Sequence, residues 1–596
     1  MSSVPERGDI DEEFTWALEE MFVSDAEWEE AYETVESRLD ELSAYEGRVT
    51  EDAETLLDVL ELREELMRTV ANVTSYARMR SDEDTRNQEH QALKARAQSL
   101  ASDASSAASF IEPELQRASR KELDAFVESE PALDQYDHYL DDVLRMKPHT
   151  RSPEVEEVLA DLSEVTGAPS DIYGMLANAD MSFPVVEGPD GDEIEITQSN
   201  FTTHLKDEDR AFRQRVYEGY MGEWGAFRNT VGSSLKNSVT ADVKTARARN
   251  YETAREAALD GTNVPPAVYD NLVETVRDNV DVLQRHVDLK RDRLGVDTLE
   301  MYDLYTPLTD EEPPEVPYEQ AKEWVIEAVA PLGEEYQSRL AEGLDSRWVD
   351  VYENKGKRSG AYSGGTYDSQ PYILMNYQDD ATSMFTLAHE LGHSMHSELT
   401  SEEQPYVYSN YEIFVAEVAS TVNEALLTHY LLDTVEDETL RRHVLDEYLE
   451  RFRSTLFRQT LFADFEHQIH NVVEEGGALT PDAMDEMYGD LKREFYANAN
   501  VDDHIEREWM RIPHFYYNYY VYQYATGISA ANAIVDRILE EGEPAARDYL
   551  DFLRLGSREY PLELLAGAGV DMRSPEVVES AIEAYDGYVA EFEQLS

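Results

Sequence analysis

Residues 389 to 393 combine two histidines and a glutamate at the spacing of a catalytic metal site. The run His389-Glu390-Leu391-Gly392-His393 follows a stretch that lacks proline and glycine and places apolar residues at helical spacing. Residues four apart share one face of a helix, so both imidazoles can bind one metal ion. The glutamate can then take a proton from a water molecule at that metal. Because the pattern is short, the alternative is a buried helix with two hydrogen-bonded histidines.

A catalytic zinc site needs a third protein ligand, and here a carboxylate on a second helix is expected. The pattern H-E-x-x-H-x-x-G-x-x-H fails, because His396 and Leu399 take the places of its glycine and last histidine. A second helix is predicted from about residue 411 to residue 432. Its glutamates Glu417 and Glu424 share a face two turns apart, and spacing alone does not choose between them.

A tyrosine-rich segment near the C-terminus could supply donors for an oxyanion. Residues 516 to 524 contain six tyrosines in nine residues, which is unusual for an ordinary core because each buried hydroxyl needs a partner. Peptide hydrolysis needs donors aimed at the charge that develops on the scissile carbonyl. His514 and helix-spaced tyrosines, such as Tyr519 with Tyr522, can provide them. Aromatic packing at a helix crossing is the alternative for any single ring.

Two short regions have the pattern of β-strands. Residues 183 to 197 predict a small hairpin at a domain boundary. Three strand-like runs between residues 346 and 377 predict a small sheet directly before the metal-binding helix. An edge strand there, near Gly360 or near Tyr372, could align an extended peptide through backbone hydrogen bonds.

The rest of the chain reads as successive amphipathic helices, with apolar residues recurring at i, i+3 and i+4. The pattern breaks too often for a sustained coiled coil, and no repeat of fixed period is visible. We therefore predict a mainly α fold, with an N-terminal helical domain at 1–200 and a catalytic domain at 201–596.

The composition describes an acidic chain without cysteine. The 126 acidic residues outnumber the 51 basic ones, for a net charge of −75, and only 11 of the basic residues are lysine. Acid excess with few lysines is typical of cytoplasmic proteins from salt-accumulating organisms. The charge makes nucleic acid and anionic membranes poor partners, and the lack of cysteine excludes disulfides and thiolate metal sites. With no apolar signal segment or membrane span, we expect a cytoplasmic protein.

Two motifs resemble those of a known enzyme family. The run from His389 to His396 is similar to the H-E-[FL]-G-H-x-x-H motif of the thimet oligopeptidase group of zinc peptidases. The run from Phe414 to Ser420 is similar to the motif on that group's second helix. Residues 360–362, residues 371–376 and the tyrosine-rich segment resemble its oligoendopeptidase F branch more closely.

The resemblance implies a multi-helix body around a deep channel and one Zn²⁺ ion per chain, bound by His389, His393 and Glu417. It also implies cleavage of internal bonds in short unstructured peptides, with a histidine and tyrosines of the aromatic segment stabilising the oxyanion. The oligomeric state stays open. The predicted site residues are Glu390, His514, Tyr519 and Tyr522 for catalysis, and Gly360, Ala361, Tyr362, Tyr372 and Tyr524 for substrate binding.

Two other functions are compatible with the pattern. A zinc carboxypeptidase would need a cation for the terminal carboxylate of its substrate, and Arg511 is a candidate. A non-catalytic peptide-binding protein would not need Glu390. A second metal at His467 and His470 is not expected, and His396 is expected to pack beside the site rather than bind the ion.

The acidic surface leads to a first prediction. Dilution into low salt should unfold the chain and abolish activity, because the Debye length grows from about 3 Å at 1 M to about 30 Å at 0.01 M and the acidic groups then repel one another. Circular dichroism and activity measured along a KCl series test this. Full stability and activity in low salt would contradict it.

Overall fold

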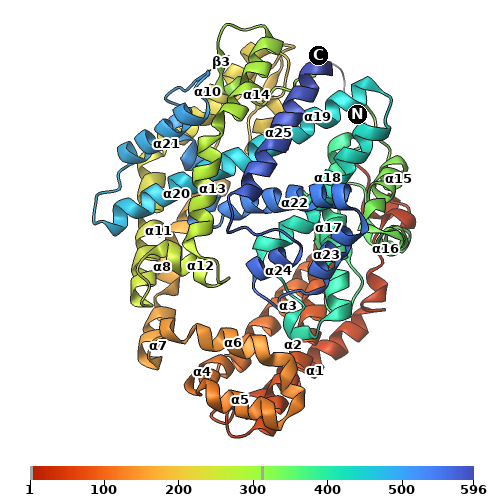
Figure 1. Ribbon diagram of the computed structural model, residues 1–596, viewed down its shortest axis with the longest axis vertical. Helices are drawn as coiled ribbons and strands as arrows, with labels where there is room; N and C mark the ends of the chain where they lie inside the picture. The colour runs from red at the N-terminus through yellow and green to blue at the C-terminus, as the bar shows by residue number, and fades with distance from the viewer. Residues whose placement is uncertain (1–3, 310–313, 596) are drawn as a thin grey trace. The chain divides into compact units, whose positions relative to one another are not determined.

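The computed structural model describes residues 4–309 and 314–595, and it is built almost entirely of helices (Figure 1). Residue contacts divide the chain into two compact units, each made of three chain segments. Unit 1 comprises Met1–Lys147, Pro313–Thr434 and Ile534–Val570, and unit 2 comprises Pro148–Glu312, Val435–Ala533 and Asp571–Ser596. The predicted mainly α fold is confirmed. The compact units do not follow the predicted division at residue 200, because segments distant in sequence pack together in each.

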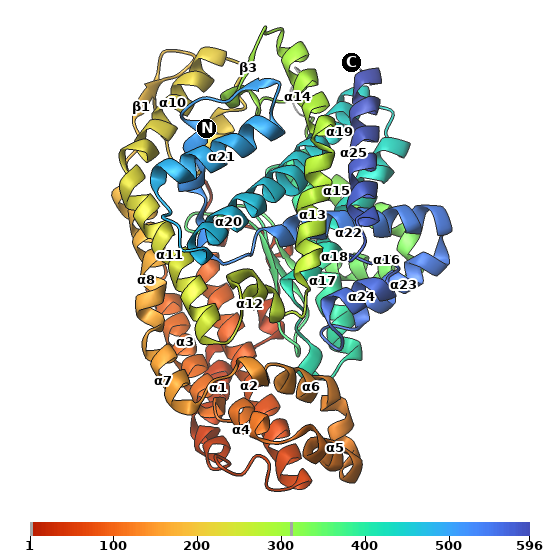
Figure 2. The same ribbon diagram turned by 60° about the vertical axis from the view of Figure 1, so that its left-hand side comes forward.

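Unit 1 contains the helix with the predicted metal ligands. Its helices are α1 (Asp25–Ser43), α2 (Ala53–Glu83), α3 (Gln88–Ala108), α4 (Ile111–Arg117), α5 (Arg120–Ser129), α6 (Asp137–Arg145), α15 (Tyr318–Ala328), α16 (Glu334–Asp345), α17 (Ala381–Glu403), α18 (Ile413–Thr434), α23 (Glu543–Arg554) and α24 (Pro561–Gly567). Helices α1, α2 and α3 pack side by side (Figure 2).

Unit 2 contains the tyrosine-rich segment. Its helices are α7 (Pro153–Asp161), α8 (Ser163–Met175), α9 (Phe201–His204), α10 (Arg210–Ala226), α11 (Arg228–Ala248), α12 (Ala254–Asp260), α13 (Pro266–Asp278), α14 (Val280–Leu294), α19 (Glu438–Phe452), α20 (Arg458–Glu474), α21 (Pro481–Phe495) and α25 (Glu576–Leu595). Helix α22 (Tyr522–Glu541) begins in unit 2 and ends in unit 1.

Three small sheets are present among the described residues. Strands β1 (Val185–Glu187) and β2 (Glu193–Glu195) form the predicted hairpin, and β3 (Leu299–Glu300) pairs with β7 (Ala499–Asn500). The third sheet has the order β4-β6-β5, with β4 (Val349–Asp350) parallel to β6 (Tyr372–Leu374) and β5 (Tyr362–Gly364) antiparallel to it. This sheet packs against α17, so the predicted sheet beside the metal-binding helix is confirmed.

Helix α17 forms where the sequence predicts it, and α18 crosses it closely. The side chain of Asp380 caps α17 by accepting a hydrogen bond from the backbone N–H of Ser383 at 2.7 Å. A Cβ atom on Gly392 would lie 2.5 Å from the carbonyl oxygen of Ala419 and 2.6 Å from the Cα of Ser420. Only glycine at position 392 therefore lets the backbones of α17 and α18 come this close.

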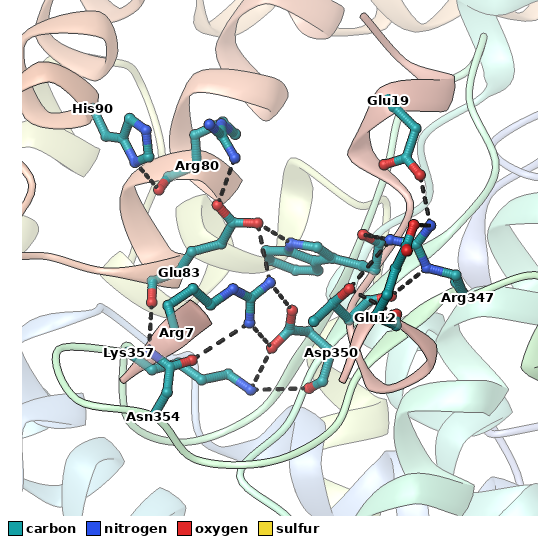
Figure 3. A network of polar contacts seen from close by, with 12 residues as sticks. Arg7, Glu12, Glu19, Arg80, Glu83, His90, Arg347, Asp350, Asn354 and Lys357 are labelled. Carbon is teal, nitrogen blue, oxygen red and sulfur yellow. Dashed lines mark hydrogen bonds and ion pairs between the residues drawn. The ribbon is translucent and has the colours of Figure 1, made fainter. Parts of the chain in front are cut away.

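A buried polar network in unit 1 joins the N-terminal segment, the end of α2 and strand β4 (Figure 3). The carboxylate of Asp350 accepts from Arg7 Nη1 at 2.8 Å and lies 2.6 Å from Lys357 Nζ. Arg7 also reaches Glu83 at 3.1 Å, and Trp16 Nε1 donates to the same carboxylate at 2.9 Å. The side chains of Asp350 and Lys357 are no more than 1% exposed. The network therefore links β4, at one edge of the three-stranded sheet, to helix α2 and to the N-terminal segment.

This network leads to a second prediction. Asp350→Asn should lower the free energy of unfolding by about 3 kcal/mol, because it leaves the buried ammonium of Lys357 without its carboxylate and removes one of the two carboxylates that pair with Arg7. Burial alone would raise the pKa of Asp350, but Arg7 and Lys357 hold it below its ordinary value. The stabilisation is therefore present above the pKa of an unfolded aspartate, about 3.9, and is lost as the pH falls through the lower folded value.

Urea unfolding at constant high salt, near neutral pH and in acid, measures both effects. The control is Glu51→Gln, since Glu51 pairs with Arg48 where both side chains are more than half exposed, and little change is expected there. An Asp350→Asn variant as stable as the wild type near neutral pH would contradict a stabilising role of the pair.

Candidate metal centre and peptide-binding strand

The crossing of α17 and α18 brings His389, His393 and Glu417 together. The Nε2 atoms of His389 and His393 are 3.2 Å apart. Glu417 Oε2 lies 3.6 Å from Nε2 of His389 and 4.0 Å from Nε2 of His393. Ligand atoms about 2.1 Å from a tetrahedral ion would be roughly 3.4 Å from one another. The three side chains therefore fit one zinc ion. They are the one group of this kind among the described residues, with all ligand atoms within 4.8 Å of one another.

Glu424, the second candidate ligand, has a different place. Its Oε1 lies 2.6 Å from Nδ1 of His389, and its side chain is fully buried. This contact puts the proton of His389 on Nδ1 and leaves Nε2 free to bind a metal. Burial alone would lower the pKa of His389, but the neighbouring carboxylates, Glu424 first, raise it above its ordinary value. At His393, burial lowers the pKa of the imidazole to about 3, with a further contribution from His389.

Glu390 lies between the metal ligands and strand β5. It is 7% exposed, and burial raises the pKa of its carboxyl to about 7, with the neighbouring Glu417 adding to this and His389 opposing it. The backbone N–H of Ser363 lies near the Glu390 carboxylate and favours its charged form, against the effect of burial. Ser363 Oγ also lies 2.9 Å from the Oγ of Ser394, one residue after His393. Strand β5 therefore lies next to the predicted general base and also contacts the metal-binding helix.

The pairing of the sheet shows which edge of β5 is open. Ser363 stands opposite Ile373, and the backbone N–H of Ile373 donates at 2.7 Å to the carbonyl oxygen of Trp348, the residue just before β4 on the other side of β6. Ser363 and Ile373 are therefore a non-hydrogen-bonded pair, so the N–H and C=O of Ser363 point away from β6. That free edge is the one where Ser363 meets Glu390. Sequence reasoning missed Ser363, although strand alternation beside Tyr362 would have pointed to it.

Strand β6 cannot take the same role. Tyr372 is fully buried, and its hydroxyl donates to the carbonyl oxygen of Ala17 at 3.2 Å. Strand β6 is paired on both edges, so it has no free edge for a peptide. Tyr372 is therefore a core residue and not a substrate contact, and of the two predicted aligning strands only β5 remains.

Three residues predicted to bind substrate, Gly360, Ala361 and Tyr362, lie in or just before β5. Gly360 has a φ of +84° in the bend before the strand, and its carbonyl oxygen accepts from Asn376 Nδ2 at 2.9 Å. Ala361 follows it and is half-buried. The hydroxyl of Tyr362 donates to Asp82 at 3.1 Å, so this ring anchors the strand to α2. Gly360 therefore shapes the turn, and a peptide would meet the backbone of the strand.

The predicted oxyanion residues lie in unit 2, and they do not form the helix-spaced set that the sequence suggests. Helix α22 begins only at Tyr522, and Asn518 and Tyr519 have left-handed φ values of +43° and +58°. Tyr519 and Tyr522 are each 2% exposed and pack against Tyr269. The prediction that these two tyrosines share a helix face is therefore wrong, because the chain turns before the helix starts.

His514 instead belongs to a half-buried aromatic group with Tyr520 and Tyr524. The ring of Tyr520 lies parallel to that of His514 with centroids 5.9 Å apart, and Tyr524 meets His514 edge-on at the same distance. The hydroxyls of Tyr520 and Tyr524 are 3.4 Å apart. Tyr520 is thus a further candidate donor. The tyrosine-rich pattern contains it, but only the folded chain distinguishes its surroundings.

The remaining histidines have structural contacts. His467 Nδ1 lies 3.1 Å from the hydroxyl of Tyr519, and His470 Nδ1 lies 2.8 Å from the carbonyl oxygen of Glu466. His396 is 1% exposed and stacks on Tyr411 with ring centroids 3.7 Å apart. Burial lowers its pKa to about 3, so it packs as a neutral ring.

Comparisons with known proteins identify the family of this chain. The model of peptidase family M3 matches residues 203–584, and a model described as oligopeptidase F matches residues 114–183. The chain belongs to peptidase family M3. Family membership makes the chain a metallopeptidase with peptide substrates.

Individual relatives extend the similarity over the whole chain. Oligopeptidase PepF of Bacillus subtilis is 44% identical over 595 residues, covering 100% of this chain and 89% of that protein. Group B oligopeptidase PepB of Streptococcus agalactiae is 40% identical, covering 99% of this chain and 98% of that protein. The crystal structure of oligoendopeptidase-F from Enterococcus faecium has a TM-score of 0.75 at 36% identity, covering 96% of this chain and 99% of that one. The resemblance to oligoendopeptidase F is confirmed, and the protein is a metalloendopeptidase.

Among the described residues, no helix combines the length and the apolar character that a membrane span requires.

The contact between His389 and Glu424 leads to a third prediction. Glu424→Gln should weaken zinc binding by about 10- to 100-fold while leaving the three ligands in place, because the glutamine cannot hold the imidazole proton as a carboxylate does. Competition with a chromophoric chelator measures this affinity. Glu412→Gln, an exposed glutamate just before α18, is the matched control and should bind zinc as the wild type does. Unchanged affinity in Glu424→Gln would refute the role.

Proposed function

We propose that this metallopeptidase is a zinc-dependent oligoendopeptidase that cleaves internal bonds of short unstructured peptides. The observation that carries the proposal is the position of Glu390, which lies beside the His389, His393 and Glu417 cluster and contacts the open edge of β5. An extended peptide added to that edge would present its backbone next to the general base and the metal ligands.

Each residue at the site would have a separate role in the reaction. Bound zinc supplies Lewis acidity, which polarises the scissile carbonyl and acidifies water. Glu390 accepts a proton from the attacking water and later delivers it to the leaving amine. The open edge of β5 at Ser363 would orient the peptide backbone, and Glu424 would keep Nε2 of His389 directed at the metal position.

Donors to the oxyanion form the second part of the proposal. We infer from the family resemblance that His514 acts there with a tyrosine of the aromatic segment. Tyr520 and Tyr524 are supported by their rings beside His514 and by being half-buried. Tyr519 and Tyr522 are less well suited, because each is 2% exposed. Hydroxyls that donate to the developing charge would lower the barrier to attack.

The carboxypeptidase alternative is less well supported. Arg511, its candidate for binding a terminal carboxylate, donates to Glu508 at 2.9 Å and reaches the hydroxyl of Tyr305 at 3.3 Å. The relatives that match over the whole chain include oligoendopeptidases. A purely peptide-binding role would give no reason for a buried carboxyl at Glu390.

The fourth prediction tests this function. An internally quenched peptide blocked at both ends should be cleaved in high salt, a chelator should stop the cleavage and Zn²⁺ should restore it. Glu390→Gln should lower kcat by about 10²- to 10⁴-fold with zinc still bound, because it removes the general base. Peptides of increasing length would locate the size limit. Cleavage of free-ended peptides but not of blocked ones would favour the carboxypeptidase, and undiminished turnover in Glu390→Gln would refute the mechanism.

A further inference from the structure

Arg78, on helix α2 of unit 1, is a cation without an anionic partner. The chain has 126 acidic residues against 51 basic ones, and its buried arginines are paired, as Arg213 is with Asp303 and Arg453 with Glu450. Within residues 4–309 and 314–595, Arg78 has no ion pair and no hydrogen bond, and its Nε atom is buried without a partner. A half-buried guanidinium loses hydration, so leaving it unpaired costs free energy that a bound anion would restore.

The surroundings of Arg78 place it at the predicted peptide-binding strand. Its guanidinium lies 5.1 Å from the centroid of the Tyr362 ring. Its Nη2 lies 2.9 Å from the point that a Cβ atom of Gly364 would occupy. Because Gly364 has no side chain, the guanidinium can sit over the strand itself. Arg358 also stacks on Tyr362, at 5.5 Å, but its Nη1 lies 3.3 Å from a carboxylate oxygen of Asp82, so only Arg78 is free to pair.

Strand alternation shows which side of a bound peptide would meet this charge. Side chains of successive strand residues point to opposite faces. Ser363 contacts Ser394 on the α17 face, so positions 362 and 364 belong to the other face, where Arg78 lies. A peptide paired with the open edge of β5 would place alternate side chains on that same face, with Cβ atoms about 4.5 to 5.5 Å from position 364.

We propose that Arg78 binds a carboxylate of the peptide substrate and so sets a preference among peptides. The carboxylate belongs either to an acidic side chain on the Arg78 face or to the C-terminus of a short peptide that ends there. A guanidinium suits either source because it can donate two parallel hydrogen bonds to a carboxylate. This proposal rests on the proposed function and adds a residue that determines specificity. The cation–π contact with Tyr362 alone would not account for a buried Nε without a partner.

The test has two arms. In the first, a glutamate or its isostere glutamine is moved position by position along a neutral, blocked, internally quenched peptide. In the second, neutral peptides of increasing length carry either a free C-terminal carboxylate or an amide. In the first arm, the wild type should cleave the glutamate peptide with a kcat/KM about tenfold higher than the glutamine peptide at one position. Otherwise, in the second arm, it should prefer the free C-terminal carboxylate over the amide by about the same factor at one peptide length. The arm that shows the preference identifies the source of the carboxylate.

Variants assign the preference to Arg78. Arg78→Met keeps the aliphatic stem and should bring the ratio of carboxylate to amide substrates close to one. Arg117→Met, at an exposed arginine on α4 of the same unit, makes the same change in charge and should keep the wild-type ratio. Arg78→Lys, a milder change, should retain part of the preference and replaces the methionine variant if that one does not fold.

The outcomes separate this proposal from the proposed function. Equal wild-type cleavage of carboxylate and amide peptides in both arms would overturn the role of Arg78 alone, and so would a full preference retained in Arg78→Met. A wild-type chain that cleaves none of the peptides, although zinc is bound, would instead overturn the oligoendopeptidase assignment.

Discussion

The close crossing of α17 and α18 is the constraint on which the metal site depends. A methyl group at position 392 would overlap the carbonyl oxygen of Ala419 and the Cα of Ser420. Helices that carry ordinary side chains at a crossing stay 8 to 10 Å apart, and a small residue allows a closer approach. This approach brings a carboxylate of α18 within 4.0 Å of both imidazoles of α17. The glycine of the motif is therefore as much a part of the metal site as the histidines are.

The same crossing explains why one helix supplies two carboxylates with different roles. Glu417 and Glu424 are two turns apart, so they meet His389 from its two ends: Glu417 near Nε2 and Glu424 at Nδ1. In the proposed zinc site, one carboxylate would complete the ligand set and the other would direct the imidazole. A buried carboxylate such as Glu424 is tolerated because it is hydrogen-bonded to a group that can share the charge.

Burial of charge recurs at the sheet whose open edge lies next to Glu390. Asp350 is buried between Arg7 and Lys357, and the hydroxyl of Tyr362 donates a hydrogen bond to Asp82. A short strand has few backbone hydrogen bonds of its own, so these side-chain contacts hold β4, β6 and β5 against the helices of unit 1. Figure 3 shows the contacts of Asp350. The strand edge next to Glu390 is thereby held in a fixed position, which an aligned peptide requires.

The sequence by itself determined the chemistry and the local elements. The histidine spacing, the second helix, the three strands before residue 377 and the mainly helical fold could all be predicted, because each depends on periodicity, capping and turn residues within a short stretch. The acidic composition likewise needs no structure to be recognised. Only the tertiary structure decided which of Glu417 and Glu424 reaches the ligand side of His389, since both satisfy the same helical spacing.

Tertiary packing also decided which strand has a free edge and where α22 begins. The sequence does not show whether the strand of Tyr372 or the strand of Ser363 has the open edge, because strand order depends on pairing between segments that are not adjacent in the chain. The tyrosine run looked like one helix, yet left-handed residues at Asn518 and Tyr519 delay its start. The role of Arg78 could not be foreseen at all. Its significance lies in the partner that it lacks, and a missing partner is visible only once every neighbour is in place.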